Sequence, residues 1–498
     1  MAGRPDTNHE PRTTNHKMES RLIFEKGSPG RRSASYPAAE DLTEDIPADL
    51  RREAAPALPE VGELELIRHY VQLSHKNFSI DTVFYPLGSC TMKYNPKVHE
   101  RVARMPEFAG LHPLTSEDHA QPMLRLLFDM GEVLKEVTGM DGITFQPFAG
   151  AHGEFVGISV IAAHHRAQGN RKRVVLTPES AHGTNPATAA MCGYTVQPLR
   201  TDPRGMVDLS DLKAKMNGEV AAIMLTNPNT FGIFETDILE IAEVVHRGGG
   251  LLYYDGANLN ALLGQCRPGD MGFDVVHMNL HKTFTTPHGG GGPGAGPVGV
   301  KAHLLPYLPV PVLVKEGDRY RLDDDRPQSI GKVSGLYGNA GMVLRAYVYA
   351  RMLGAEGMRK TSEMAVLNAN YVRARLLSHY EQKYKTQPMH ETVLSASRQK
   401  RESGVSALDV CKRLIDCGIH PPTVYFPLPT VVPEALLIEP TETETLEQLD
   451  AFVDAMVRIA REAKESPDLL REAPHHTPVG RLDEARAARQ PVLRWKRG

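Results

Sequence analysis

The sequence predicts an α/β protein with a mostly parallel sheet and a smaller C-terminal α+β domain. Short apolar runs recur through the middle of the chain, helix-like stretches separate them, and beyond about residue 341 long helix-favouring segments take over. Continuous apolar runs are typical of parallel strands, because helices bury both faces of such a sheet. Side chains with chemical roles are then expected at the strands' carboxyl ends.

The individual elements follow from periodicity. Residues 121–137 place apolar side chains at helical spacing, and residues 173–177 form an apolar run without alternation, as expected for a buried strand. The remaining strands expected are 220–225, 251–254 and 275–278, with short strands within 421–440. The remaining helices expected are 155–166, 236–246, 342–353, 363–377 and 442–465.

The first 60 residues are rich in Pro, Arg, Ser and Asn and have no sustained period, so this stretch cannot bury enough surface to fold alone. Leu22 to Phe24 are expected to lie along another subunit, whereas the first 18 residues look unanchored and Met18 is an alternative start. The predicted divisions are 1–75, an N-terminal extension and arm; 76–340, a large domain; and 341–498, a small domain and tail.

Bulk composition excludes several classes of protein. A chain of 498 residues with 41% hydrophobic and 23% charged residues can bury a sizeable core. A net charge of -3 gives no reason to expect nucleic acid or a membrane surface as partner. The five cysteines lack CxxC spacing, which argues against a disulfide framework and a zinc site. No secretory signal or bilayer-length apolar run is present, so a cytoplasmic location is expected.

Lys282 follows an apolar strand-like stretch and precedes a glycine-rich segment. A lysine amine becomes a useful nucleophile only when desolvation or neighbouring positive charge depresses its pKa, and His281 and the apolar strand can supply that setting. A lysine so placed, beside a turn able to hold a phosphate, is typical of an enzyme that binds pyridoxal phosphate as an imine. Alone the signal is weak, because most His-Lys pairs lie on the surface.

Asp255 directly follows the predicted strand 251–254, where a carboxylate can face a site. A pyridoxal ring needs such a carboxylate to keep its nitrogen protonated, because the protonated ring accepts electrons during bond cleavage. The simpler interpretation is that Asp255 shapes a turn beside Gly256. The interval of 27 residues to Lys282 leaves room for one crossover to an adjacent strand.

Two glycine-rich segments are candidates for a phosphate cradle. Residues 149–154 precede the predicted helix 155–166, and small residues let backbone N–H groups approach a phosphate at a helix N-terminus. Ordinary close packing is the alternative for this loop. The run 289–296 is short and interrupted by prolines, which favours a cradle or tight turn over a flexible linker.

Polar loops follow two further strands. Residues 180–186 come after the strand 173–177, and residues 226–230 come after the strand 220–225. His182 is placed to stack on a planar ring or bond to it. The alternative is that each Asn-Pro pair only marks a turn. Together, four polar loops that all follow strands weaken that alternative.

These residues together resemble the glycine cleavage system P-protein family, and in particular the second (beta) subunit of its two-subunit form. The motifs that carry the resemblance are Tyr85 to Pro96, Ala149 to Glu154, Ala181 to Pro186 and Asn279 to Pro297, supplemented by Pro421 to Pro427 and Pro433 to Glu444. They span most of the chain from about Leu22 onward. The strings Gly-Ser-Cys-Thr-Met-Lys-Tyr-Asn-Pro and Asn-Leu-His-Lys-Thr-Phe are highly specific.

The resemblance implies fold type I of the PLP-dependent transferases, which is aspartate aminotransferase-like. It implies pyridoxal 5'-phosphate bound as an imine on Lys282, Asp255 at the ring nitrogen, and His182, or second His281, as a proton shuttle. The remaining cofactor-binding residues that it suggests are Ala257, Gly150, Ala151, His152, His182, Thr226, Thr286 and Gly289, with no metal ligand.

The activity implied is glycine decarboxylation, with release of CO2 and transfer of the aminomethyl group to the lipoyl arm of H-protein. The implied partners are the first (alpha) subunit in an α2β2 assembly, lipoylated H-protein and, indirectly, the T- and L-proteins. Another fold-type I PLP-dependent lyase or decarboxylase is an alternative. A non-catalytic scaffold subunit is a third; it predicts a lost lysine or aspartate, and both Lys282 and Asp255 are present.

Overall fold

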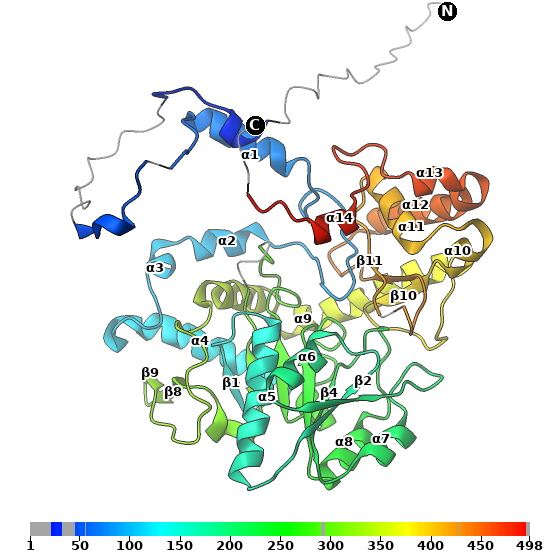
Figure 1. Cartoon of the computed structure of the whole chain (residues 1–498). Helices are drawn as coiled ribbons and strands as arrows, with labels where there is room; N and C mark the ends of the chain where they lie inside the picture. The colour runs from blue at the N-terminus through cyan, green and yellow to red at the C-terminus, as the bar shows by residue number, and fades with distance from the viewer. Residues whose placement is uncertain (1–20, 32–44, 55, 290–293, 428, 495–498) are drawn as a thin grey trace, which may run out of the picture. The chain divides into compact units, whose positions relative to one another are not determined.

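The computed structural model describes residues 21–31, 45–54, 56–289, 294–427 and 429–494 (Figure 1). The chain divides into two compact units, residues 1–78 and 79–498. The first 18 residues, expected to be unanchored, and residues 290–293 of the proposed glycine cradle lie outside the described ranges.

The first unit contains helix α1 (Glu63–Ser74) and the short 3-10 turns η2 (Ile23–Glu25) and η4 (Ala48–Leu50). An ion pair of 2.7 Å between Arg31 and Glu65 ties the segment before the helix to it. Most of the apolar side chains of α1 are exposed, including Ile67 at 54%. This unit therefore gains little from burial within itself.

A seven-stranded sheet organises the second unit. The strand order is β1, β7, β6, β5, β4, β2, β3. The strands are β1 (Gly142–Thr144), β2 (Val174–Pro178), β3 (Thr195–Leu199), β4 (Val220–Leu225), β5 (Leu251–Gly256), β6 (Val275–Met278) and β7 (Val298–Val300). Strand β7 is antiparallel to both neighbours, and the pairs from β6 to β3 are parallel. The predicted mostly parallel sheet is confirmed.

Helices cover both faces of this sheet, which explains the continuous apolar strands. Every residue of β4 and of β5 is buried. Tyr253 of β5 packs in one core with the helix α5 (Gly150–Ala167), whereas its neighbour Tyr254 packs in another core with α4 (Glu117–Thr138) and α8 (Ile238–Arg247). Successive side chains of a strand point to opposite faces, so each strand serves both cores.

Several predicted elements lie where the periodicity indicated, and others differ for identifiable reasons. Helix α5 begins at Gly150, so the predicted glycine turn is itself the first helical turn. The pair Asn185-Pro186 lies in the first turn of α6 (Thr184–Met191), where proline is tolerated. The two helices expected at 342–353 and 363–377 form one element, α9 (Ala340–Leu376), broken only by the non-helical Gly354.

A second, three-stranded antiparallel sheet lies in the C-terminal part, in the order β10 (Thr392–Ser395), β12 (Ala435–Ile438), β11 (Thr423–Val424). The short strands expected within 421–440 are confirmed, whereas β10 was not predicted. The helix expected at 442–465 is α12 (Leu446–Glu465); it begins later because the Thr445 side chain caps it through the Gln448 amide.

The other elements are α2 (Lys97–Ala103), α3 (Pro106–Ala109), α7 (Leu209–Lys215), η5 (Pro268–Met271), η6 (Ala302–Tyr307), the hairpin β8 (Val312–Glu316) with β9 (Arg319–Asp323), α10 (Ser397–Ser403), α11 (Ala407–Asp416), α13 (Pro467–Arg471) and α14 (Glu484–Arg489). Across the described residues, none of the helices has both the length and the apolar character needed to cross a bilayer.

Candidate active site

A cavity of about 300 Å³ lies where the parallel strands of the large sheet end. Eight of the residues predicted for the site line it: Gly150, Ala151, His182, Thr226, Asp255, Ala257, His281 and Lys282. His152, Thr286 and Gly289, also predicted, are described residues that are not among its lining. Larger hollows occur elsewhere, such as one of about 680 Å³ beside the small sheet, but this cavity collects the lysine, the carboxylates and the imidazoles.

Asp255 lies near the end of β5 and is 4% exposed. Its carboxylate accepts hydrogen bonds from the Asn185 side chain at 2.9 Å and from the Ala257 backbone N–H at 3.1 Å. Burial raises the pKa of Asp255, but the charge of His277 and these hydrogen bonds outweigh it, so the pKa lies below its usual value. The site therefore contains a buried carboxylate that is kept ionised.

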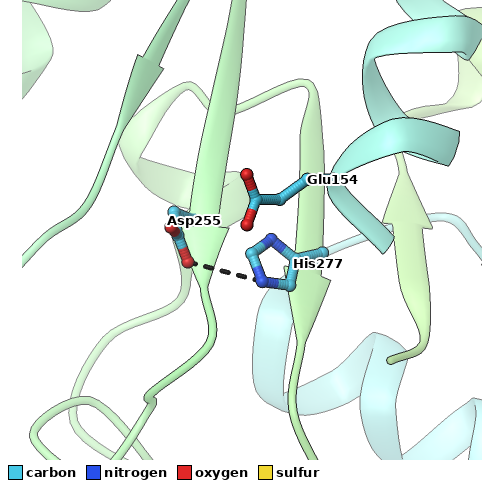
Figure 2. A group of neighbouring side chains, drawn as sticks. All are labelled: Glu154, Asp255 and His277. Atoms are coloured by element: carbon cyan, nitrogen blue, oxygen red, sulfur yellow. Dashed lines mark ion pairs between the residues drawn. The ribbon is translucent and has the colours of Figure 1, made fainter. Parts of the chain in front are cut away.

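Figure 2 shows Glu154 of α5 and His277 of β6 gathered around this carboxylate. The His277 Nε2 atom lies 3.4 Å from Asp255, and its Nδ1 atom pairs with the Tyr253 hydroxyl at 2.6 Å. The Asn185 amide, which donates to Asp255, also donates to Glu154 at 3.0 Å. One amide thus holds two buried acidic side chains in place.

Lys282 comes four residues after β6, in a turn where its own backbone N–H donates to the Asn279 carbonyl at 3.0 Å. Its ammonium group donates to the Ser89 carbonyl oxygen at 2.6 Å. Strands β5 and β6 are adjacent and parallel, so the predicted single crossover between Asp255 and Lys282 is confirmed. Both side chains line the same cavity.

The two predicted histidines differ in their surroundings. His182 is exposed, and its Nδ1 atom lies 2.8 Å from the Thr184 hydroxyl. His281 is enclosed: burial, then the charges of His288 and Lys282, lower the pKa of its imidazole to about 3. His281 is therefore uncharged at neutral pH.

The first turn of α5 faces the cavity through Gly150 and Ala151. The N-cap residue Ala149 makes no side-chain capping bond, so the first amides of the helix are not capped by it. A Cβ atom on Gly150 would approach the Asn279 amide nitrogen to 2.9 Å, which explains why glycine is needed. This helix end can therefore hold an anion such as a phosphate.

Other lining residues were not predicted as site residues. Ser89 and Cys90 were quoted in the Gly-Ser-Cys-Thr-Met string that carries the resemblance, and that string was the available signal. His277 lies inside a predicted strand, so only its polarity in an apolar run marked it. Glu391 enters from the small sheet, and nothing in its local sequence indicated this.

Comparisons with known proteins agree on the family. The family model described as "Glycine cleavage system P-protein" matches residues 33–319, and "Glycine dehydrogenase, C-terminal domain" matches residues 361–475. A protein of Halalkalibacterium halodurans named "Probable glycine dehydrogenase (decarboxylating) subunit 2" is 56% identical over 96% of this chain and 98% of its own length. A protein of the same name from Thiobacillus denitrificans is also 56% identical, over 95% of this chain and 99% of its own.

Solved structures share the fold. A crystal structure of a glycine decarboxylase (P-protein) in inhibitor-bound form superposes with a TM-score of 0.72 at 21% identity, over 85% of this chain and 95% of that one. A sphingosine-1-phosphate lyase of Burkholderia pseudomallei superposes with a TM-score of 0.61 at 13% identity, over 83% and 94%. The predicted fold type I is confirmed, and the chain belongs to the glycine cleavage system P-protein family.

Proposed function

We propose that this chain is the cofactor-bearing subunit of a glycine decarboxylase and that pyridoxal 5'-phosphate binds in the cavity at Lys282. The observation that carries the proposal is the pairing, in one cavity, of a lysine amine with a buried carboxylate that is kept ionised, Asp255. A surface lysine beside a turn-forming aspartate would not share such a cavity.

The residues present fit this cofactor. Asp255 suits the protonated ring nitrogen, because its ionised carboxylate is a strong acceptor in a dry setting. The N-terminus of α5 at Gly150 and Ala151 suits the phosphate. Thr286, from the predicted set, offers a buried hydroxyl that has no partner among the described residues. His182 suits the face of the ring, and Thr226 and Ala257 complete the lining.

When bound, the cofactor supplies an electron-accepting ring for the pair released by loss of CO2. Lys282 would hold the cofactor, which requires its amine to leave the Ser89 carbonyl that it contacts here. Asn185 and His277 keep Asp255 ionised and oriented. His281 is uncharged and can accept a hydrogen bond, whereas the exposed His182 can exchange protons with solvent.

We further propose that the chain works with a first subunit in an α2β2 assembly and passes the aminomethyl group to the lipoyl arm of H-protein in the cytoplasm. The partner subunit is supported by the name of the relatives, "subunit 2", and these relatives match nearly the whole chain. The T- and L-proteins would then act on the same carrier.

Glycine–bicarbonate exchange tests substrate, reaction and partnership together. Exchange is expected when this chain, the first subunit, pyridoxal phosphate and lipoylated H-protein are all present. Full activity from this chain alone would contradict the two-subunit assembly, and no exchange by the complete mixture would contradict glycine decarboxylation. Absorption spectra add a test of the anchor: the imine band should vanish in Lys282→Ala and persist in the control Lys301→Ala, whose amine contacts the Gly139 carbonyl.

A further inference from the structure

Two buried carboxyl groups face each other beside the cavity. Strands β10 and β12 pair with Thr392 opposite Ile438, and the residues next to this pair, Glu391 and Glu439, bring carboxylate oxygens within 4.8 Å of each other. Glu391 is 5% exposed and Glu439 is fully buried. Two like charges this close in a dry environment cannot both persist without compensation, so one carboxyl is expected to carry a proton.

Glu439 has the partners that an ionised carboxylate needs. It accepts hydrogen bonds from the Thr91 backbone N–H at 3.2 Å and the Thr91 hydroxyl at 2.6 Å. The side-chain amides of Asn258 and Asn260 donate to it at 2.8 and 3.2 Å. Four hydrogen-bond donors directed at one carboxylate stabilise a negative charge there.

Glu391 has far less support for a charge. Its side chain accepts one hydrogen bond, from the Ser89 backbone N–H at 2.9 Å. Burial, then the charge of Glu439, raises the pKa of Glu391, and these effects outweigh the Ser89 hydrogen bond and the charge of Lys282. The other titratable groups that face it are Cys90 and His390, whose Nε2 atom lies 4.0 Å away. Glu391 is therefore the protonated member of the pair.

The reaction proposed above consumes a proton. When the carboxylate of glycine leaves as CO2, the electron pair of that bond forms a new bond from carbon to one sulfur of the carrier disulfide. The S–S bond breaks, glycine carbon is oxidised, and the disulfide is reduced. The second sulfur leaves with an electron pair and must take up one proton to become a thiol.

Three of the imidazoles that line the cavity are poor sources of that proton. Burial lowers the pKa of His281, His288 and His390, so each is uncharged at neutral pH. Glu391 lines the same cavity, next to the small sheet, and Ser89 contacts both Glu391, through its backbone N–H, and Lys282, through its carbonyl. Glu391 lies in the cavity and faces the carboxylate of Glu439, so it is suited to act as an uncharged proton donor.

Building on the proposed function, we propose that Glu391 is a catalytic acid, held protonated opposite Glu439, which delivers its proton to the departing sulfur of the carrier disulfide. The O–H bond of Glu391 breaks as the S–H bond forms. The ionised Glu391 then faces Glu439 and is reprotonated from solvent. The charge of Lys282, which lowers the pKa of Glu391, offsets the transient second charge.

The first test needs neither glycine nor carrier. In the cofactor-loaded complex, infrared difference spectra between the unchanged protein and Glu391→Gln should show loss of the carbonyl-stretch band of one protonated carboxyl. Glutamine keeps an oxygen that can accept from the Ser89 N–H, so the segment around Ser89 can stay in place. The control is Glu381→Gln in the same part of the chain, where Arg401 holds the pKa of Glu381 below its usual value and no such band should be lost. No lost band in Glu391→Gln would overturn the proposal.

The second test separates the steps of the reaction. With glycine and oxidised, lipoylated carrier, Glu391→Gln should bind glycine with unchanged affinity but transfer the aminomethyl group about 100-fold more slowly, within the usual range for a general acid. The transfer rate of the unchanged complex should fall as pH rises through the Glu391 pKa, and that fall should be absent from the variant. Two results would overturn the proposal: an equal slowing of glycine binding and of aminomethyl transfer, or a variant whose transfer rate still falls as pH rises. A complex that never decarboxylates glycine would refute the proposed function and leave the infrared result standing.

Discussion

Asp255 and His277 are paired residues on adjacent parallel strands, β5 and β6, and their side chains lie 3.4 Å apart. The register of the sheet, rather than a flexible loop, therefore positions the imidazole beside the carboxylate. Because strand pairing fixes both backbones, the electrostatic support of Asp255 is built into the sheet before any ligand arrives.

Replacing His277 by asparagine should make Asp255 easier to protonate. Asp255 has a lowered pKa, so its charged form persists as pH falls toward that pKa, and loss of the His277 charge moves protonation to higher pH. The measurement is the pH at which cofactor absorption changes, with an upward shift expected. His303→Asn, which changes a histidine 3.6 Å from Asp274, is the control. An unchanged midpoint in His277→Asn would contradict this role.

A methyl group at Gly150 should weaken cofactor binding. The added Cβ atom would lie 2.9 Å from the Asn279 amide nitrogen, so the first turn of α5 or Asn279 must shift. We expect Gly150→Ala to weaken the affinity by at least about tenfold, or about 1.4 kcal/mol, in a cofactor titration. Gly218→Ala is the matched control, because no atom lies within 4 Å of its new Cβ. Equal affinities in the two variants would refute the packing argument.

Lys93 and Glu442 form a buried ion pair of 2.7 Å, with side chains 1% and 9% exposed. Lys93→Met leaves the Glu442 charge uncompensated and should lower the free energy of unfolding by about 3–5 kcal/mol in urea titrations. The double variant Lys93→Met with Glu442→Gln should recover much of the loss. At the surface pair Lys213–Glu240, 53% and 48% exposed, Lys213→Met should cost about 1 kcal/mol or less. Similar costs at both pairs would contradict the prediction.

Stability should depend on pH through His246. Its Nε2 atom lies 2.8 Å from Asp274, and that hydrogen bond raises the pKa of His246 above its ordinary value. A raised pKa stabilises the fold fully below the unfolded value and loses this contribution as pH rises through the folded value. Urea unfolding of the unchanged protein and His246→Asn should therefore differ most in mild acid. A difference that grows toward alkaline pH would contradict this.

Local sequence predicted the sheet well where burial is complete. Strands β4 and β6 have the predicted bounds, because uninterrupted apolar residues identify a strand enclosed on both faces. Asp255 and Lys282 were predicted for a related reason: Asp255 lies near the end of such a strand and Lys282 follows another. The central geometry of the site is thus encoded in short stretches of sequence.

The rest of the site depends on contacts between distant segments. The bond from Ser89 to Glu391 joins residues 302 positions apart, and no local pattern can indicate such a partner. His152, predicted as a cofactor-binding residue, does not line the cavity, because the turn that holds it is helical and gives successive side chains different directions. Long-range packing decides these positions.

Helix α9 contributes side chains to two hydrophobic cores. Its first half, through Val343 and Tyr349, packs into the core of the large sheet, and its second half, through Val372 and Leu376, packs into the core of the small one. Because the two halves belong to one helix, unfolding of either core disturbs the helix and exposes apolar surface in the other core. Heating should therefore melt both in a single cooperative calorimetric transition, so the small sheet has no independent existence as a folded fragment.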